Sequence, residues 1–397
     1  MNPHVAKLYE IARKPERVIV GLMSGTSLDG LDVALCRFTG SGTQTETELL
    51  AFETVPYTES VKESVRAVFA KQQVDFELLT LLHPWVGQLH ADMVLGCLRQ
   101  WHRRPADVDL IASHGQTVYH APQSLHQRPG YGNATLQIGD GDHLAVRTGI
   151  ITLSDFRQKH IAAGGEGAPL AVYGDFLLFS QAGEDRIMLN IGGIANFTYL
   201  AGDLDAGKMF STDVGPGNTL IDAFSRLHFN RPFDEDGAFA AAGTVNEPLL
   251  AALLDHPFFA AGFPKTTGPE LFGPAYVQAA QQRSVTENLS ANDVLATLTV
   301  FSATGIAEAV KQSFTGKTPV VYMSGGGMHN PVLVAHLKSL LPDATFKTTA
   351  ELRIQPDAKE AVLFAILANE AVAGGSVDFG NRPGIPNVTM GKVSFPG

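Results

Sequence analysis

Cysteine, long apolar runs and excess positive charge are all scarce in this sequence. Its 397 residues contain only two cysteines, Cys36 and Cys97, too few for a disulfide framework, and neither has metal-ligating residues beside it. Residues 1–18 lack the apolar segment and small-residue cleavage site of a secretory signal, and they predict a short amphipathic helix. No apolar stretch reaches the length that predicts a bilayer span. A reducing cytoplasm is the expected compartment, and we expect no membrane partner.

The balance of charge and the length narrow the choice further. A formal net charge of −11 argues against nucleic acid as a partner, because phosphate backbones are bound by clustered Lys and Arg. An anionic small substrate remains compatible with this charge, since a local basic pocket can form in an acidic protein. A chain of 397 residues is longer than one ordinary hydrophobic core requires and favours two domains.

Two familiar phosphate-binding motifs are also absent. The sequence near its first strand has neither G-x-x-x-x-G-K-[ST] nor a G-x-G-x-x-G that opens a helix. Residues 18–38 instead predict a strand, a small polar turn and a second strand. The turn around Gly25, Thr26 and Ser27 offers backbone N–H groups and hydroxyls to a polyphosphate, and Asp29 and Asp32 are suited to Mg²⁺. The alternative is an ordinary hairpin whose aspartates cap the turn.

The rest of the chain predicts alternating strands and helices in two halves. A second strand–glycine turn–strand at 186–200 indicates that the first half is duplicated. We therefore expect one domain from residues 1–155 plus 376–397, with a strand-like tail returning to it, and a second from 156–375. The glycine-rich segment 162–169 marks the expected crossover. Further predicted strands are 46–57, 110–117, 136–138 and 150–156; predicted helices are 60–71, 76–99, 139–149, 219–227, 294–311 and 361–373, with a strand, a triple glycine and a new helix at 319–331.

Candidate site residues in the second half lie at strand ends. Asp213 precedes a Gly-Pro-Gly turn, where a rigid carboxylate suits a general base, although an N-cap aspartate is the alternative. Lys265 is expected to be exposed to solvent. Glycine turns are the further nucleotide-binding candidates: Asn190, Gly192 and Gly193 for phosphate, and Gly325, Gly326 and Gly327 for adenine or ribose.

Two strings, GLMSGTSLDGLD at 21–32 and DVGPGN at 213–218, resemble signatures of the anhydro-N-acetylmuramic acid kinases. That family belongs to the superfamily of acetate and sugar kinases, chaperone ATPases and actin. The resemblance runs from residue 18 to the C-terminus. It implies an α/β, two-domain actin-like or sugar-kinase (ribonuclease H-like) fold, with a duplicated mixed β-sheet core and an interdomain cleft.

The resemblance also implies an activity: ATP- and Mg²⁺-dependent conversion of 1,6-anhydro-N-acetylmuramic acid, with water, to N-acetylmuramic acid 6-phosphate during cell-wall recycling. It implies roles for individual residues. The catalytic residues would be Asp213 and Glu360, although Glu360 is otherwise an ordinary helix-surface residue. His114 and the Asp155–Arg157 pair have structural alternatives, a hydrogen-bonded histidine and a salt bridge. The implied nucleotide-binding segment is Gly25, Thr26, Ser27, Leu28, Asp29, Gly30, Leu31 and Asp32, with the two aspartates as metal ligands; the implied substrate-binding residues are His114, Gln116, Asp155, Arg157, Gly217 and Asn218.

Two rival functions are kept open. One is a kinase of the same superfold that acts on another sugar or on a carboxylate. The other is an actin-like or chaperone-type ATPase, although the chain has little room for the additional domain that such proteins carry. The expected partner is a small anhydro amino sugar, and the sequence leaves open whether the protein forms a homodimer.

Overall fold

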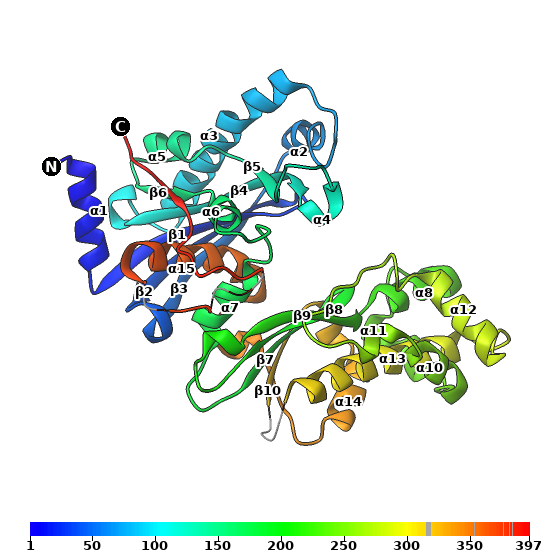
Figure 1. Cartoon of the computed structure of the whole chain (residues 1–397). Helices are drawn as coiled ribbons and strands as arrows, with labels where there is room; N and C mark the ends of the chain where they lie inside the picture. Colours follow the sequence, from blue (N-terminus) through cyan, green and yellow to red (C-terminus); the bar gives the residue numbers. More distant parts are fainter. Residues whose placement is uncertain (315–318, 353, 376, 381, 383) are drawn as a thin grey trace. The chain divides into compact units, whose positions relative to one another are not determined.

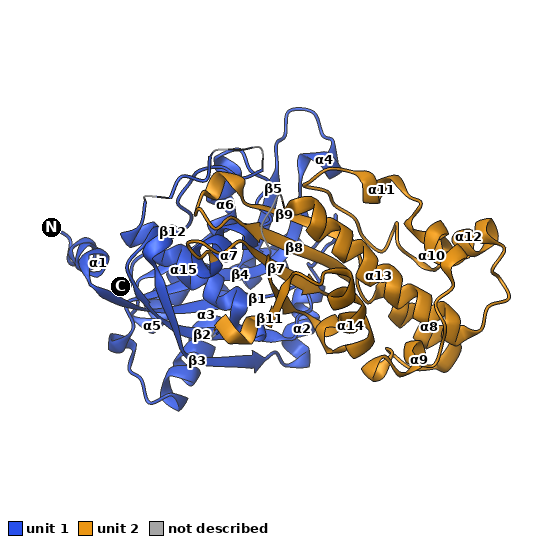
Figure 2. Ribbon diagram, turned by 90° about the horizontal axis from the view of Figure 1, so that it is seen from below, with its two compact units in different colours: residues 1–179, 353–397 blue, residues 180–352 orange. Residues whose placement is uncertain are grey.

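The structure, a computed structural model, describes residues 1–314, 319–352, 354–375, 377–380, 382 and 384–397. It divides into two compact units (Figure 2). Unit 1 comprises residues 1–179 and 353–397, and unit 2 comprises residues 180–352. The predicted boundary residue 376 and residues 381 and 383 of the predicted tail lie outside the described residues.

Unit 1 is built on a seven-stranded mixed sheet with the order β12-β6-β4-β1-β2-β3, in which β5 pairs with β4. Strands β1, β2 and β3 form an antiparallel meander, whereas β4 runs parallel to β1 and β6 runs parallel to β4. The predicted hairpin and the returning tail are confirmed, because β12 pairs with β6. The strands are β1 (Glu16–Ser24), β2 (Gly30–Thr39), β3 (Glu46–Pro56), β4 (Leu110–Ala121), β5 (Ala134–Ile138), β6 (Thr152–Ser154) and β12 (Lys392–Ser394).

Unit 2 repeats this topology in a five-stranded sheet with the order β11-β10-β7-β8-β9. Strands β7, β8 and β9 again form an antiparallel meander, and β10 and β11 again follow in parallel beside the first strand. The predicted duplication of a mixed-sheet α/β core is therefore confirmed. The strands are β7 (Arg186–Ile191), β8 (Ile194–Leu200), β9 (Phe210–Pro216), β10 (Val320–Ser324) and β11 (Thr345–Thr348).

Helices cover both sheets (Figure 1). Several begin at a residue whose side chain accepts a hydrogen bond from a backbone N–H of the first turn, such as Asp75, Ser290 and Asn330. In unit 1 the helices are α1 (Pro3–Arg13), α2 (Glu59–Arg66), α3 (Phe76–Gln100), α4 (Gln123–His126), α5 (Gly141–Thr148), α6 (Phe156–Ala162), α7 (Ala171–Phe179) and α15 (Lys359–Ala373). In unit 2 they are α8 (Thr219–Phe229), α9 (Ala238–Ala241), α10 (Glu247–Leu254), α11 (Pro257–Ala260), α12 (Pro274–Ser284), α13 (Ala291–Ser313) and α14 (Pro331–Leu340).

The unit boundaries differ from those expected at 155/156 and 375/376. Helix α15 follows strand β11 of unit 2 in sequence, yet it packs on β1, β2, β4 and α7 in unit 1. The contact is close because Gly21 has no side chain: a Cβ there would lie 1.9 Å from the carbonyl oxygen of Ala361. The crossovers consequently fall at 179/180 and 352/353, rather than in the glycine-rich segment 162–169.

One helix does not match the expectation drawn from hydropathy. By length and composition alone, α13 is long and apolar enough to cross a membrane. In the structure, 78% of its most apolar window is buried. Its side chains, including Leu298, Phe301 and Ile306, belong to the hydrophobic core of unit 2. An apolar helix that is buried on most of its surface is typical of a protein core.

Candidate functional site

The turn between β1 and β2 presents a short polar segment to solvent. Thr26, Ser27 and Asp29 are exposed, and a Cβ added to Gly25 would meet only the Ser27 hydroxyl, at 3.8 Å. The backbone at this turn is therefore open to an anionic ligand. Three other residues of the predicted nucleotide-binding segment are structural. Leu28 and Leu31 are buried, and Gly30 lies so close to the carbonyl of Val55 that a Cβ would be only 2.3 Å from its oxygen. Side-chain contacts from Leu28 and Leu31 to a nucleotide are thus not supported.

The two carboxylates that follow the turn differ in their surroundings. Asp29 is exposed, whereas Asp32 is half-buried and accepts a hydrogen bond from the Thr54 hydroxyl over 2.6 Å. Burial raises the pKa of Asp32, and the negative charges of Asp357 and Asp29 raise it further. A divalent cation would relieve this repulsion. The described residues contain no group of three or more His, Cys, Asp or Glu side chains arranged to hold a metal, so any Mg²⁺ here relies on water or substrate oxygens as well.

A cavity of about 280 Å³ opens beside this turn within unit 1. It brings together residues that are far apart in sequence, because β1, β4 and β6 are parallel and their carboxyl ends meet at one edge of the sheet. Six of the predicted site residues lie on its wall: Gly25, Thr26, Ser27, His114, Arg157 and Glu360. The complete lining is Met23, Ser24, Gly25, Thr26, Ser27, His114, Thr117, Arg157 and Glu360.

His114 holds Arg157 at the wall of this cavity. Its Nε2 accepts from the Arg157 Nε–H over 2.8 Å, and Arg157 Nη1 donates to the carbonyl of Gly167 over 2.7 Å. Burial, with the charge of Arg157, lowers the pKa of His114 to about 3, so the ring is neutral and able to accept. Glu360 is exposed at the cavity wall, yet loss of part of its hydration to the surrounding protein raises its pKa, an effect that the charge of Arg157 opposes. The cavity therefore combines a fixed cation with a carboxyl group of raised pKa.

Two predicted substrate-binding residues of unit 1 do not line this cavity. Gln116 is fully buried, and its amide hydrogens go to the carbonyls of Gly25 and Thr117 at 3.2 and 3.1 Å. It supports the turn and is not placed to touch a sugar. Asp155 forms an ion pair with Lys392 over 3.0 Å, so the salt bridge with Arg157 that the sequence suggested is not formed.

In unit 2, the predicted glycine turns converge at one edge of the sheet. The N–H of Gly217 donates to the carbonyl of Gly193, and the N–H of Asn218 to the carbonyl of Gly192, both over 2.8 Å. A Cβ on Gly325, whose φ is +82°, would lie 2.5 Å from Oδ1 of Asn190. The absence of side chains is what allows these backbones to approach. Gly326 is exposed, and Gly327 packs against Ile191.

Asp213 lies near the end of β9 and is clamped by the segment that follows α11. Its N–H donates to the carbonyl of Lys265 over 2.9 Å, and its Oδ2 accepts from the N–H of Thr267, also over 2.9 Å. The side chain is not an N-cap, because Asn218 holds the cap position of α8. Burial raises the pKa of Asp213, as does the negative charge of Glu270. A half-buried carboxylate with one oxygen fixed and a raised pKa suits a general base.

Sequence reasoning missed the role of Lys265. Its ammonium donates to the carbonyl of Phe258 over 2.9 Å and lies 4.5 Å and 5.2 Å from the ring centroids of Phe258 and Phe263. The expectation of an exposed lysine is wrong, since this side chain anchors the segment that clamps Asp213. The neighbouring aromatic residues, Phe258, Phe259 and Phe263, were the only signal in the sequence.

Comparisons with known proteins agree on one family. The family described as "AnmK: Anhydro-N-acetylmuramic acid kinase" matches residues 17–385. The anhydro-N-acetylmuramic acid kinase of Pseudoalteromonas atlantica (strain T6c / ATCC BAA-1087) is 57% identical over 400 residues, which cover 100% of each chain. That of Caldanaerobacter subterraneus subsp. tengcongensis is 38% identical over 394 residues, 98% of this chain and 100% of its own.

Solved structures are more distant. The activator of the 2-hydroxyisocaproyl-CoA dehydratase from Clostridium difficile with bound ADPNP gives a TM-score of 0.40 at 12% identity, with 90% of this chain and 96% of that chain covered. This likeness is too low to support a conclusion about fold or function. The matches in sequence, in contrast, extend over nearly the whole chain. The chain belongs to the anhydro-N-acetylmuramic acid kinase family.

Proposed function

We propose that this protein is an ATP-dependent kinase that converts 1,6-anhydro-N-acetylmuramic acid and water to N-acetylmuramic acid 6-phosphate, in the recycling of cell-wall sugars. Family membership supports the activity. The structural observation that carries the proposal is the clamped carboxylate of Asp213, with one oxygen hydrogen-bonded to Thr267 and a pKa raised by burial.

The open turn of unit 1 would bind phosphate oxygens of ATP, and the glycine turns of unit 2 are a separate candidate for the nucleotide. Backbone N–H groups around these turns suit anionic oxygens, because the positions are open: a Cβ on Gly25 would meet only the Ser27 hydroxyl, at 3.8 Å, and a Cβ on Gly192 would meet nothing closer than 3.4 Å. Asp29 and Asp32 would hold Mg²⁺. When bound, the cation would neutralise charge on the polyphosphate. Gly325 to Gly327 would offer a flat surface to the nucleoside.

The chemistry of the bridge oxygen assigns the proton to water. In the anhydro sugar O6 is an ether oxygen, so it has no proton for a base to remove. Asp213 would instead take a proton from a water molecule whose oxygen bonds to the anomeric carbon C1. The C1–O6 bond then breaks, its electron pair stays on O6, and O6 bonds to the γ-phosphorus as ADP leaves. The atoms and charges balance with the proton held on Asp213.

The cavity in unit 1 supports roles for the remaining predicted residues. We propose that Arg157, held by His114, binds an anionic group of the substrate or the transferring phosphoryl group. Glu360, on the same cavity wall, would bind a hydroxyl or amide of the substrate. In unit 2, Gly217 and Asn218 would hold the glycine turn at Gly192 and Gly193 in place, since the N–H of each donates to a carbonyl of that turn.

An isotope experiment tests the mechanism directly. The reaction run with ATP in ¹⁸O-labelled water should place label on the anomeric oxygen and none on the phosphate, as read by mass spectrometry. Label on the phosphate would contradict attack of water at C1. A panel of sugars separates the rivals: phosphorylation of N-acetylmuramic acid in preference to its anhydro form would favour an ordinary sugar kinase, and ATP hydrolysis that no sugar alters would favour an actin-like ATPase.

A further inference from the structure

A line of buried polar side chains joins the turn between β1 and β2 to helix α3. The Ser24 hydroxyl lies 2.5 Å from Oε1 of Gln116 and 2.8 Å from the Tyr57 hydroxyl. The Tyr57 hydroxyl in turn lies 2.7 Å from Nε2 of His90. All four side chains are buried, with Tyr57 the most exposed at 5%. The proposed reaction uses none of these four groups.

The amide of Gln116 fixes the direction of the first hydrogen bond in this line. The amide nitrogen of Gln116 faces two carbonyls, those of Gly25 and Thr117, so its Oε1 must face Ser24. An amide oxygen can only accept. The single hydroxyl hydrogen of Ser24 is therefore donated to Gln116, and none remains for Tyr57.

The hydrogen between Ser24 and Tyr57 must then come from Tyr57. The Tyr57 oxygen consequently accepts from His90, whose Nε2 carries the proton. Burial lowers the pKa of His90 to about 4, so the ring is neutral and has one N–H. Among the described residues its Nδ1 has no hydrogen-bond partner. Donation thus runs in one direction, from His90 through Tyr57, Ser24 and Gln116 to the carbonyl of Gly25.

Tyr57 is also bonded to the far side of the same turn. Its backbone N–H donates to the carbonyl of Asp29 over 3.0 Å. One residue therefore holds both ends of the exposed turn, through its hydroxyl at Ser24 and through its backbone at Asp29. At Gly25 the turn is held by its carbonyl, which accepts from the Gln116 amide over 3.2 Å and from the N–H of Leu28 over 3.4 Å.

We propose that Tyr57, oriented by His90, is a positioning residue that fixes the turn at Gly25 to Ser27 for a nucleotide polyphosphate. This inference rests on the proposed function, in which that turn binds the phosphates of ATP. A turn held in one conformation binds more tightly, because less conformational entropy is lost when the ligand arrives.

The variant Tyr57→Phe removes the hydroxyl and leaves the ring. We expect the Kd for ATP, measured by calorimetry, to rise about 3- to 10-fold, the effect of one net hydrogen bond, while the KM for the sugar stays unchanged. A general loss of folded enzyme would instead lower kcat and leave both ligand affinities as they were.

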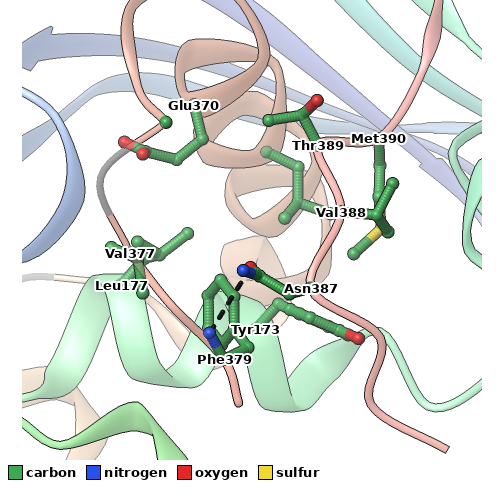
Figure 3. A pocket seen from close by; sticks show the side chains of 11 residues that line it. Tyr173, Leu177, Glu370, Val377, Phe379, Asn387, Val388, Thr389 and Met390 are labelled. Carbon is green, nitrogen blue, oxygen red and sulfur yellow. Dashed lines mark hydrogen bonds between the residues drawn. The ribbon is translucent and has the colours of Figure 1, made fainter. Parts of the chain in front are cut away.

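Tyr173→Phe is the matched control. Tyr173 is equally buried in unit 1, and its hydroxyl donates to the carbonyl of Pro386 over 2.9 Å. It lines a separate cavity of about 210 Å³ between α7, α15 and the tail, which shares no lining residue with the cavity beside the turn (Figure 3). This variant should lose a similar amount of thermal stability and keep the ATP affinity of the wild type.

A pair of substitutions tests the orienting role of His90. His90→Leu removes the donor to Tyr57, whereas His90→Gln keeps an amide N–H at about the same reach. The leucine variant should weaken ATP binding like Tyr57→Phe, and the glutamine variant should restore most of it. Equal ATP affinity in both variants would contradict the orienting role.

Other outcomes are equally decisive. Wild-type affinity for ATP in folded Tyr57→Phe would overturn the inference. So would a loss of ATP affinity in Tyr173→Phe equal to that in Tyr57→Phe. In either case, phosphorylation of the sugar by the wild-type enzyme would leave the proposed function intact. A wild-type protein that binds no ATP would overturn both. Should Tyr57→Phe not fold, NMR of the ¹⁵N-histidine-labelled wild type decides: His90 must carry its proton on Nε2, and a proton on Nδ1 would refute the direction of the line.

Discussion

The backbone N–H of Thr267 donates to Oδ2 of Asp213 over 2.9 Å, and in the proposed mechanism the other carboxylate oxygen would take the proton. The same short segment accepts the N–H of Asp213 at the carbonyl of Lys265. The orientation of the proposed base is therefore set by a loop more than fifty positions away along the chain. Changes to the carboxylate, to its electrostatic surroundings and to the loop should have distinguishable effects.

Asp213→Asn keeps the shape of the side chain and its bond from Thr267, but it loses the base. We expect kcat to fall by about 10²–10⁴-fold, the usual worth of a positioned base, with the Kd for ATP unchanged. Asp222→Asn is the matched control, since Asp222 is another half-buried aspartate of unit 2 whose pKa is raised by burial. Normal turnover by Asp213→Asn would remove this residue from the mechanism.

Glu270→Gln should move the pH dependence of kcat in a known direction. A base acts when it is deprotonated, so the raised pKa of Asp213 makes activity fall at a higher pH than for an ordinary aspartate. The charge of Glu270 contributes to that rise, and its removal lowers the pKa again. The acidic limb of the profile should thus shift to lower pH.

Salt provides the internal control for this effect. Glu270 is exposed, so its influence on Asp213 should shrink when the ionic strength is raised. The wild-type and Glu270→Gln profiles should converge at high salt. A limb that stays in place at low salt, or moves to higher pH, would show that Glu270 does not act on Asp213.

Lys265→Met should loosen the clamp from its far end. The change removes the donor to the carbonyl of Phe258 and the charge over two aromatic rings, and we expect the free energy of unfolding to fall by about 1–2 kcal/mol. A weaker bond from Thr267 raises the pKa of Asp213 further, so the acidic limb should move to higher pH, opposite to Glu270→Gln. A loss of stability without a shift of the acidic limb of the pH profile would show that Lys265 does not influence the pKa of Asp213.

Gly25→Val should block the turn between β1 and β2, the proposed phosphate site, without unfolding the protein. The position is open, with only the Ser27 hydroxyl near an added Cβ, so the fold should tolerate the side chain while an incoming phosphate should not. We expect at least about a tenfold rise in the Kd for ATP, which corresponds to about 1.4 kcal/mol. Gly132→Val, at another open glycine of unit 1, should bind ATP normally. Unaltered calorimetry of Gly25→Val would place the nucleotide elsewhere.

Local patterns in the sequence were enough to predict both hairpins. An apolar β-branched segment that ends in Gly, Ser or Asn specifies its own turn, and the observed β1–β2 and β7–β8 pairs follow those limits closely. The duplication was visible for the same reason. Asp213 could be singled out because a strand end followed by Gly-Pro-Gly is also a local signal.

Features that depend on distant partners could not be predicted. Asp155 has Arg157 close by in sequence, yet it pairs with Lys392, 237 positions away. His90 occupies a buried position of an apolar helix, where spacing alone indicates nothing but core. Gln116 was assigned to the sugar through the family resemblance, and alternation along a strand does not reveal which neighbouring group accepts from its amide. Only the fold brings Ser24 and Gln116 side by side in adjacent strands.

The path of the chain between the two units has a consequence for synthesis on the ribosome. Unit 2 is one continuous segment, 180–352, whereas unit 1 needs residues 353–397 to be complete. A nascent chain of 179 residues therefore has the β1–β2 hairpin but lacks α15, and the face of β1 that packs against Ala361 stays uncovered. Unit 2 can therefore fold before α15 of unit 1 has left the ribosome. We therefore expect unit 1 to become native only after α15 can pack against Gly21 and β12 can pair with β6, although its first residues leave the ribosome first.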